Sequence, residues 1–214
     1  TQFIKENGIR EVYVGMKDPN PKVCGQGIKE LQDYGIKVHV GLLSEECEEL
    51  NKGYIKLIST KRPWVIAKVA QSEDEFLGFD SNSRTKISGK EANIHCHSLR
   101  SKVDAIMVGS QTALVDNPML TVREVEGKNP VRVIVDTNRK LPLTLNVFTD
   151  YKADTIVLCS DNKFENNKTS FAKYLSIKEN NDGNLCPENM LNVLGSEGVC
   201  TILIEGGVKL LNSF

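Results

Sequence analysis

Four short runs of apolar residues most constrain what this chain can fold into. They occupy residues 105–108, 131–135, 155–159 and 201–204. Each run is rich in β-branched residues on both faces of the strand that it would form, as a parallel sheet covered by helices on both sides requires. The sequence therefore predicts an α/β fold in which these strands are buried.

Weaker patterns extend this interpretation along the chain and divide it at Lys61-Arg62-Pro63. Residues 1–60 follow the order helix, strand, helix, strand, helix, with Ser44 expected to cap the third helix. After the break we expect a polar, irregular segment and then a helix capped by Ser88. The other elements expected in this second part are strands at 64–70 and 174–177 and a helix at 187–194.

The composition excludes several classes of function. The 214 residues are 40% hydrophobic and 26% charged, which allows a packed core, and the net charge of −1 argues against nonspecific nucleic-acid binding. No apolar run approaches the roughly 18 residues of a membrane helix, so no membrane partner is expected. The six cysteines are scattered without a CxxC pair, which predicts reduced thiols in a cytoplasmic protein.

The tripeptide His95-Cys96-His97 lies in the helix expected after Ser88. Positions i and i+2 of a helix point about 200° apart, so the two imidazoles cannot share one metal ion. We therefore expect one inward and one outward histidine and no metal site. The residues expected to share one face of this helix are Ala92, His95, Cys96 and Leu99.

Polar residues follow the first buried run and indicate a site at the end of a strand. Gly109 comes directly after the run, where it would let a ligand approach the backbone, and Thr112, Asp116 and Arg123 follow it. The segment Asp116-Asn-Pro118 is also consistent with a simple turn. Arg84, Arg100 and Arg123 are candidates for a phosphate clamp, because guanidinium groups pair with phosphate bidentately; the alternative is solvated surface charge.

The segment Glu205-Gly206-Gly207 follows the last buried run. Bare backbone at the start of a helix can bind an anionic phosphate, whereas the alternative is a tight strand-to-helix turn that needs glycine. Glu205 favours a site, because a carboxylate at the end of a buried strand needs water or a ligand. The usual dinucleotide fingerprint GxGxxG, the P-loop and the nucleophile elbow do not occur in this sequence.

These motifs, in this order, resemble the bifunctional riboflavin-biosynthesis deaminase/reductase family over nearly the whole chain. The stretches that show the resemblance are Asp-Pro-Asn-Pro at 18–21, Gly-Gln-Gly-Ile-Lys-Glu-Leu at 25–31, Leu-Asn-Lys-Gly-Tyr at 50–54, Lys-Val-Ala-Gln-Ser at 68–72, Leu-Arg-Ser-Lys-Val-Asp-Ala-Ile-Met-Val-Gly at 99–109, Asp-Asn-Pro-Met-Leu-Thr-Val-Arg at 116–123, Val-Arg-Val-Ile-Val-Asp at 131–136 and Ile-Glu-Gly-Gly at 204–207.

The resemblance implies two domains. Residues 1–60 would be the C-terminal part of a cytidine-deaminase-like domain whose zinc motifs, HxE and a later cysteine pair, are absent from this sequence; zinc is expected only in a part that precedes it. Residues 64–214 would be a reductase domain similar to dihydrofolate reductase, without its last strands.

The resemblance further implies NADPH-dependent reduction of a 5-aminouracil bearing a phosphoribosylamino group to its phosphoribitylamino product. Position by position, the residues expected to contact substrate are Arg84, Arg100, Leu120, Arg123 and Glu205, with the arginines at the 5-phosphate. Those expected to contact NADPH are Gln71, Thr112, Asp116, Gly206 and Gly207, and Asp116 or a water is the candidate proton donor. The family also implies a homo-oligomer.

Two departures from the family pattern keep one of two alternative functions open, the non-catalytic one. Ser72-Glu-Asp-Glu-Phe76 replaces a common Ser-Leu-Asp-Gly, and Lys86 stands where the family commonly has a tryptophan before the helix. One alternative is a non-catalytic nucleotide-binding homologue. The other is a protein that acts mainly as the pyrimidine deaminase of the same pathway, through zinc ligands upstream.

Overall fold

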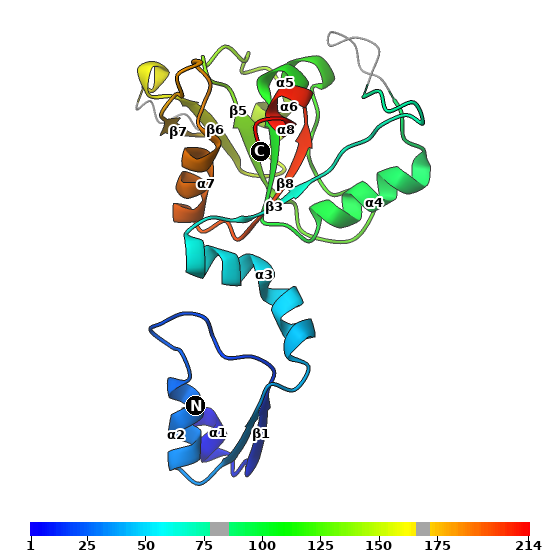
Figure 1. Cartoon of the computed structure of the whole chain (residues 1–214). Helices are drawn as coiled ribbons and strands as arrows, with labels where there is room; N and C mark the ends of the chain where they lie inside the picture. The colour runs from blue at the N-terminus through cyan, green and yellow to red at the C-terminus, as the bar shows by residue number, and fades with distance from the viewer. Residues whose placement is uncertain (78–85, 166–171) are drawn as a thin grey trace. The chain divides into compact units, whose positions relative to one another are not determined.

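A computed structural model of the chain describes residues 1–77, 86–165 and 172–214 (Figure 1). The chain forms two compact units, Thr1–Lys61 and Arg62–Phe214. The first unit contains α1 (Gln2–Glu6), β1 (Glu11–Val14), α2 (Gln26–Asp33), β2 (Lys37–Val40) and α3 (Ser44–Thr60). Its two strands pair in parallel, with Glu11 opposite Lys37.

The second unit contains a sheet of six strands in the order β3-β8-β4-β5-β6-β7, in which every pair of neighbours is parallel. Its strands are β3 (Trp64–Ala67), β4 (Ala105–Gly109), β5 (Val131–Val135), β6 (Thr155–Ser160), β7 (Lys173–Ile177) and β8 (Thr201–Gly206). Its helices are α4 (Lys90–Arg100), α5 (Ser110–Asp116), α6 (Asn146–Thr149), α7 (Pro187–Ser196) and α8 (Val208–Leu211), with a 3-10 turn at Asp161–Lys163.

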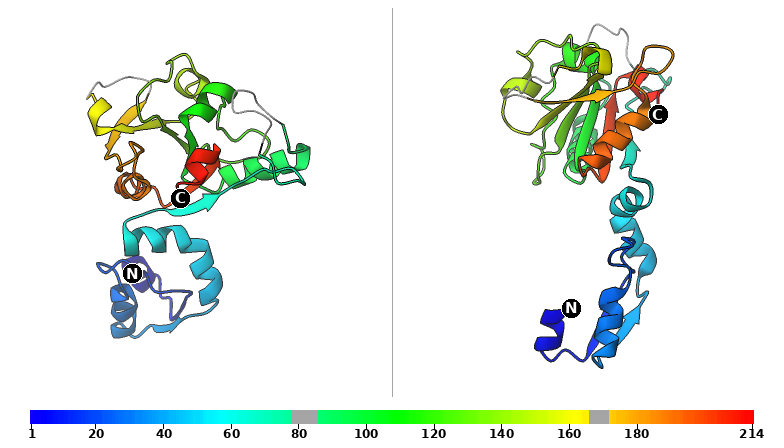
Figure 2. Two further views of the ribbon diagram at one scale, coloured as in Figure 1. Left: turned by 45° about the horizontal axis from the view of Figure 1, so that its top comes forward. Right: turned by 90° about the vertical axis from the view of Figure 1, so that its left-hand side faces the viewer.

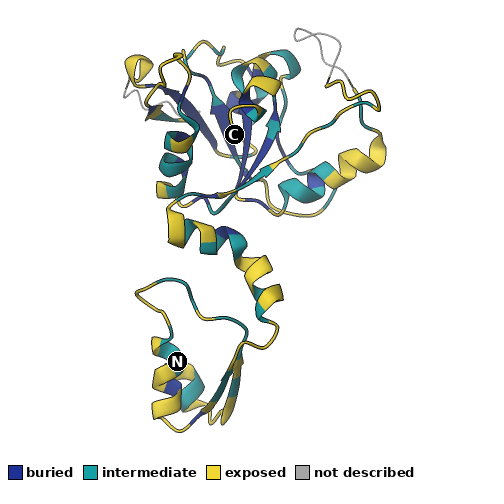
Figure 3. Cartoon of the chain, viewed as in Figure 1, coloured by how far each residue is buried: buried dark blue, intermediate teal, exposed yellow. Residues whose placement is uncertain are grey.

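Helices cover both faces of this sheet, as the apolar runs predict. On one face, Met190 and Leu194 of α7 and Leu210 of α8 pack in a cluster with Met107 and Ile204. Figure 2 shows α7 on one side of the strands. A second cluster fills the other face, and its members are Ile106, Val108, Ala113, Leu120, Ile134, Leu145, Val147, Phe148 and Val157. The central strands are the most deeply buried part of the unit (Figure 3).

The predicted caps of two helices are wrong. The N-cap of α3 is Leu43, in the left-handed region with φ of 55°, and Ser44 is the first helical residue. The N-cap of α4 is Gly89, and no side chain caps the helix, so Ser88 lies outside it. At both ends the backbone conformation sets the boundary without a side-chain hydrogen bond.

The buried face of α4 also differs from the prediction. His97 is the buried residue of this helix, whereas Ala92 and His95 are exposed. One imidazole therefore points inward and one outward, as expected, but the inward one is not on the predicted face. The strand at 64–70 ends at Ala67, and the short helix α6 has no counterpart among the predicted elements.

All six cysteines are free thiols. Within the described residues, no helix combines the length and apolar character that crossing a membrane requires. No group of three or more His, Cys, Asp or Glu side chains suited to a metal ion occurs in residues 1–77, 86–165 and 172–214.

Candidate functional site

Glycine residues mark the carboxyl ends of two neighbouring central strands. Gly109 ends β4 and Gly206 ends β8, and the register places Val108 beside Gly206 after an irregularity at Met107. The strands start in register because Ala105 pairs with Ile202. The predicted polar segments after the two strands are therefore adjacent in space.

The backbone around these glycines is closely packed. A Cβ on Gly207 would lie 3.0 Å from Thr112 Oγ1, and one on Gly109 would lie 3.9 Å from Leu210 Cβ and 4.0 Å from the Gly207 nitrogen. Gly206 has a φ of 138°, which disfavours other residues, and its peptide bond to Gly207 is cis. The segment thus brings bare backbone next to the Thr112 hydroxyl.

An ion pair joins α4 to the last strand. Arg100 Nε and Nη2 donate to the two carboxylate oxygens of Glu205, each at 2.7 Å, and Arg100 Nη1 donates to the Thr121 carbonyl oxygen at 3.1 Å. The two side chains are 12% and 8% exposed. Burial opposes the charge on Arg100, but the hydrogen bonds and negative charge of Glu205 outweigh it and raise the pKa of Arg100. Lys68 Nζ lies 4.0 Å from Glu205 and adds a second cation.

His97 and Arg123 meet one turn of helix away from this pair. The backbone N–H of Arg123 donates to His97 Nδ1 at 3.3 Å. The side chain of Arg123 is 47% exposed, with its Nε 4.0 Å from the adjacent Glu124. Burial, and then the charges of Arg100 and Arg123, lower the pKa of His97. His97 is therefore neutral at pH 7 beside an exposed arginine.

The remaining predicted site residues take different positions. Asp116 ends α5 and is half-buried, and its carboxylate makes no hydrogen bond or ion pair with any residue that the structure describes. Leu120 is 2% exposed and has a φ of 54°, so its side chain belongs to the core beneath the loop. Gln71 is exposed in the segment after β3. Arg84 lies outside the described residues.

Comparison with known proteins assigns the second unit. Residues 63–214 match the RibD C-terminal domain family.

The chain belongs to this family.

Its relatives include riboflavin biosynthesis proteins RibD from two bacteria. The protein of Aquifex aeolicus is 36% identical over 217 residues, which cover 100% of this chain and 60% of that protein. That of Actinobacillus pleuropneumoniae is 35% identical over 214 residues, which cover 98% and 57%. The chain thus spans less than two thirds of the length of these relatives.

Solved structures agree with this assignment. The diaminohydroxyphosphoribosylaminopyrimidine deaminase/5-amino-6-(5-phosphoribosylamino)uracil reductase of Thermotoga maritima superposes with a TM-score of 0.85 at 31% identity, over 100% of this chain and 58% of that one. The riboflavin biosynthesis reductase Rib7 of Saccharomyces cerevisiae shares the fold, with a TM-score of 0.59 at 24% identity over 78% and 75%. The predicted reductase fold, similar to dihydrofolate reductase, is confirmed.

Two residues of the site in this RibD C-terminal domain, Lys68 and His97, were not predicted, and neither was the role of a buried arginine near the start of β5, Arg132. Lys68 approaches Glu205, His97 holds the backbone of Arg123, and Arg132 is 1% exposed on β5 and donates to the Met119 carbonyl oxygen at 3.3 Å. Arg132 also donates to Asp150 Oδ1 at 2.8 Å. A charged residue inside an apolar run was the one available signal for Arg132, because a buried charge must have a partner.

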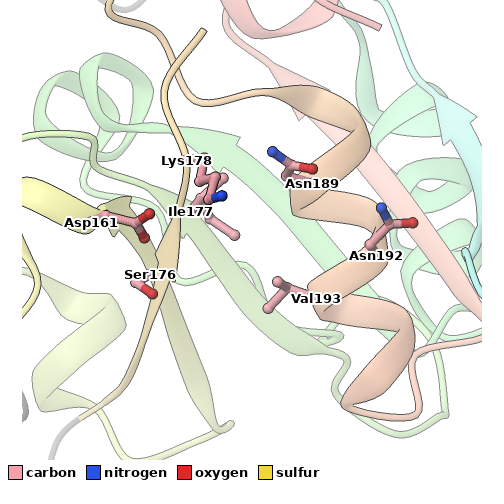
Figure 4. Close-up of a pocket in the computed structure, with 7 residues that line it drawn as sticks. All are labelled: Asp161, Ser176, Ile177, Lys178, Asn189, Asn192 and Val193. Carbon is pink, nitrogen blue, oxygen red and sulfur yellow. The ribbon is translucent and has the colours of Figure 1, made fainter.

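A cavity of about 370 Å³ lies elsewhere in the domain (Figure 4). It lies between β7 and α7, and two strands, β5 and β6, separate β7 from β4 in the sheet. Its lining residues are Asp161, Ser176, Ile177, Lys178, Asn189, Asn192 and Val193. None of the predicted site residues that the structure describes contributes to it, so the candidate site is the polar cluster at the ends of β4 and β8.

Proposed function

We propose that this chain contains the NADPH-dependent reductase that converts 5-amino-6-(5-phosphoribosylamino)uracil to the phosphoribitylamino product. One observation favours this function above all. Bare glycine backbone after β4 and β8 lies on the same part of the sheet as a buried Arg100–Glu205 pair and the exposed Arg123. The printed name of the Thermotoga maritima protein, which includes this uracil reductase activity, supports the proposal.

The residues present fit a nicotinamide dinucleotide. Gly109, Gly206 and Gly207 keep side chains away from the ends of two strands, and Thr112 offers a hydroxyl beside them. Backbone without a Cβ permits close approach of a pyrophosphate group. We therefore assign Thr112, Gly206 and Gly207 to cofactor binding, with Gln71 as a further proposed contact. When bound, NADPH supplies the hydride for the sugar C1.

The substrate phosphate is assigned to the arginines. The side chain of Arg123 is exposed, and its guanidinium can bind a phosphate bidentately. Arg100 has five N–H donors, of which three are used by Glu205 and Thr121, so two remain for a ligand. Glu205 would hold the guanidinium of Arg100 in place beside the substrate. Leu120 would form the apolar floor of the site.

The protonation step is assigned to Asp116. Reduction of an open-chain imine at the sugar C1 adds a hydride to carbon and a proton to nitrogen, so the protein or water must supply that proton. Asp116 ends α5, four residues after Thr112, and its carboxylate is not engaged by any described residue. These features make it the proposed donor, through a water or directly.

Binding and turnover test the proposal separately. Fluorescence titration of the full-length protein with NADPH should show binding, and NADPH oxidation should require the phosphoribosylaminouracil. Absence of binding at millimolar NADPH would refute the proposal. Tight binding without oxidation would point to a non-catalytic nucleotide-binding protein. Turnover with NADH as fast as with NADPH would contradict the assignment of NADPH as the cofactor but not the reductase activity.

We also propose that the protein works as a homo-oligomer on a small-molecule substrate. The sole support for the oligomer is the resemblance to the deaminase/reductase family. Light scattering coupled to size-exclusion chromatography measures the mass directly. A mass equal to one chain at micromolar concentration would contradict this proposal.

A further inference from the structure

The two ring nitrogens of His97 differ in their hydrogen bonding. Nδ1 accepts the backbone N–H of Arg123 at 3.3 Å, so it cannot bear a proton. The proton of the neutral ring is therefore on Nε2. That nitrogen is buried and has no hydrogen-bond partner among the described residues. Buried polar groups usually have hydrogen-bond partners, so a fully buried imidazole with only one bonded nitrogen is unusual. The role of His97 therefore depends on its one hydrogen bond, to the backbone of Arg123.

The bond is one of two that fix the same loop to the same helix. Arg100 donates to the carbonyl oxygen of Thr121, and His97 accepts from the N–H of Arg123, two residues further along. His97 and Arg100 are three residues apart on α4, so they lie on one side of the helix. The backbone that positions the exposed Arg123 guanidinium is thus held at two points by α4.

Protonation of the ring would break the hydrogen bond between His97 and the backbone of Arg123. An imidazolium has N–H donors at both nitrogens, so Nδ1 would then face the N–H of Arg123 with a proton of its own. The charged groups around His97 are Arg100 on α4, Arg123 and Glu124 on the loop and Glu205 on β8. The two arginines oppose a positive ring, the two glutamates favour it only partly, and burial opposes it most.

We infer that His97 is a positioning residue, which as a neutral imidazole fixes Arg123 for the substrate phosphate and which releases it when the ring is charged. The inference rests on the proposed function for its effect on the substrate and deepens it with a pH dependence. Because burial and the arginines lower the pKa of His97 below 6.5, the neutral form persists into mildly acidic solution. Substrate affinity should therefore be constant above pH 6.5 and weaken as the pH falls through the lowered pKa.

The test compares the full-length natural protein with His97→Asn and His97→Leu. Asparagine places an amide oxygen near the position of Nδ1, so it can accept from Arg123 but cannot take up a proton. Leucine has a similar size to histidine and accepts no hydrogen bond. Comparison of the two variants therefore separates the effect of losing the hydrogen-bond acceptor from the effect of losing the group that takes up a proton.

The first measurements need no catalysis. Nitrogen NMR of labelled histidine should show the Nε2–H tautomer of His97 at pH 7. Hydrogen exchange of the Arg123 amide should be about three- to tenfold faster in His97→Leu than in the natural protein, the range for one neutral hydrogen bond, and nearly unchanged in His97→Asn. A charged ring, an Nδ1–H tautomer or equal exchange in all three proteins would overturn the inference.

The kinetic measurement follows KM for the aminouracil substrate from pH 5 to pH 8. In the natural protein KM should rise at acidic pH while kcat changes less. In His97→Asn the rise should be smaller, because only protonation of the substrate phosphate, whose second pKa is about 6, remains. In His97→Leu, KM should be about three- to tenfold higher than in the natural protein at pH 8, and the two values should converge at acidic pH, where the natural protein also lacks the bond. A natural protein and His97→Asn with the same pH curve would overturn the positioning role. If the natural protein did not oxidise NADPH, the proposed function would fail, and the amide exchange would still decide the role of His97.

Discussion

Arg100 and Arg123 belong to one candidate site but differ in their exposure and in the contacts that they make within the protein. Arg100 is 12% exposed and bound to both oxygens of Glu205, which is 8% exposed. Arg123 is 47% exposed, and its closest acid is 4.0 Å away. Their substitution should therefore affect different properties.

Arg100→Ala should lower the free energy of unfolding by about 3 kcal/mol, because it leaves the carboxylate of Glu205 buried without its partner. Urea unfolding measures the loss. The double variant Arg100→Ala/Glu205→Ala removes both charges and should recover part of it. A loss in the double variant equal to the sum of the losses in Arg100→Ala and Glu205→Ala would show that the pair is not coupled.

Arg123→Ala should raise the KM for the substrate more than the KM for NADPH, because it removes a proposed bidentate pair with phosphate worth about 2–3 kcal/mol. The free energy of unfolding should change little, since the side chain is exposed. Steady-state kinetics with each substrate varied in turn measures the two constants. A larger effect on NADPH would refute the assignment of Arg123 to the substrate.

At this scale the sequence predicts the residue types of the site better than their contacts. Guanidinium groups indicate a phosphate ligand, and the resemblance selects Arg100 and Arg123 from the many cations. The role of His97 could not be predicted, since helix geometry says that His95 and His97 point apart but does not say which is buried. The bond to Arg123 depends on a loop that only the folded chain places against α4.

Strands were easier to predict than helix ends, for a physical reason. A buried strand needs apolar side chains on both faces, so β4, β5, β6 and β8 can be read from composition within a residue or two. A helix can begin without a side-chain cap, as α3 and α4 do. The four-residue helix α6 is too short for a periodic pattern; Asn117 fixes its start through two hydrogen bonds with Asn146.

The turn after β8 allows a test of the cofactor site. Gly207→Ala places a Cβ 3.0 Å from Thr112 Oγ1, so Thr112 must move and the affinity for NADPH should fall, about tenfold for a displacement worth 1.4 kcal/mol. Gly89→Ala is the matched control, because its Cβ meets nothing within 4 Å and its φ is −78°. Equal NADPH affinity in both variants, measured by fluorescence titration, would remove the turn from the site.

Two compact units suggest two separable contributions to stability. Leu194 is fully buried in the second unit, and Leu31 is 4% exposed in the first. Each change to alanine should cost about 2–5 kcal/mol within its own unit. NADPH should raise the melting temperature of the transition that Leu194→Ala lowers and leave the one that Leu31→Ala lowers unchanged, as calorimetry can show. A shift of both transitions would place part of the cofactor contacts in the first unit.

Long-range pairing within the site is the property that patterns along the chain predict least. Arg100 and Glu205 are 105 positions apart, and no spacing rule joins them. Their meeting follows from the sheet order, in which β8 lies beside β4, and this order was not predicted from the apolar runs. The resemblance to a known family supplied what periodicity could not.

The position of β8 has a consequence for synthesis on the ribosome. Residues 201–206 are inserted between two strands made much earlier, so a growing polypeptide holds β3 and β4 with their facing edges unpaired until these residues emerge. The apolar side chains of Ile106 and Met107 then have no lateral neighbour on that side. We expect such nascent intermediates to be bound by chaperones that shield open sheet edges.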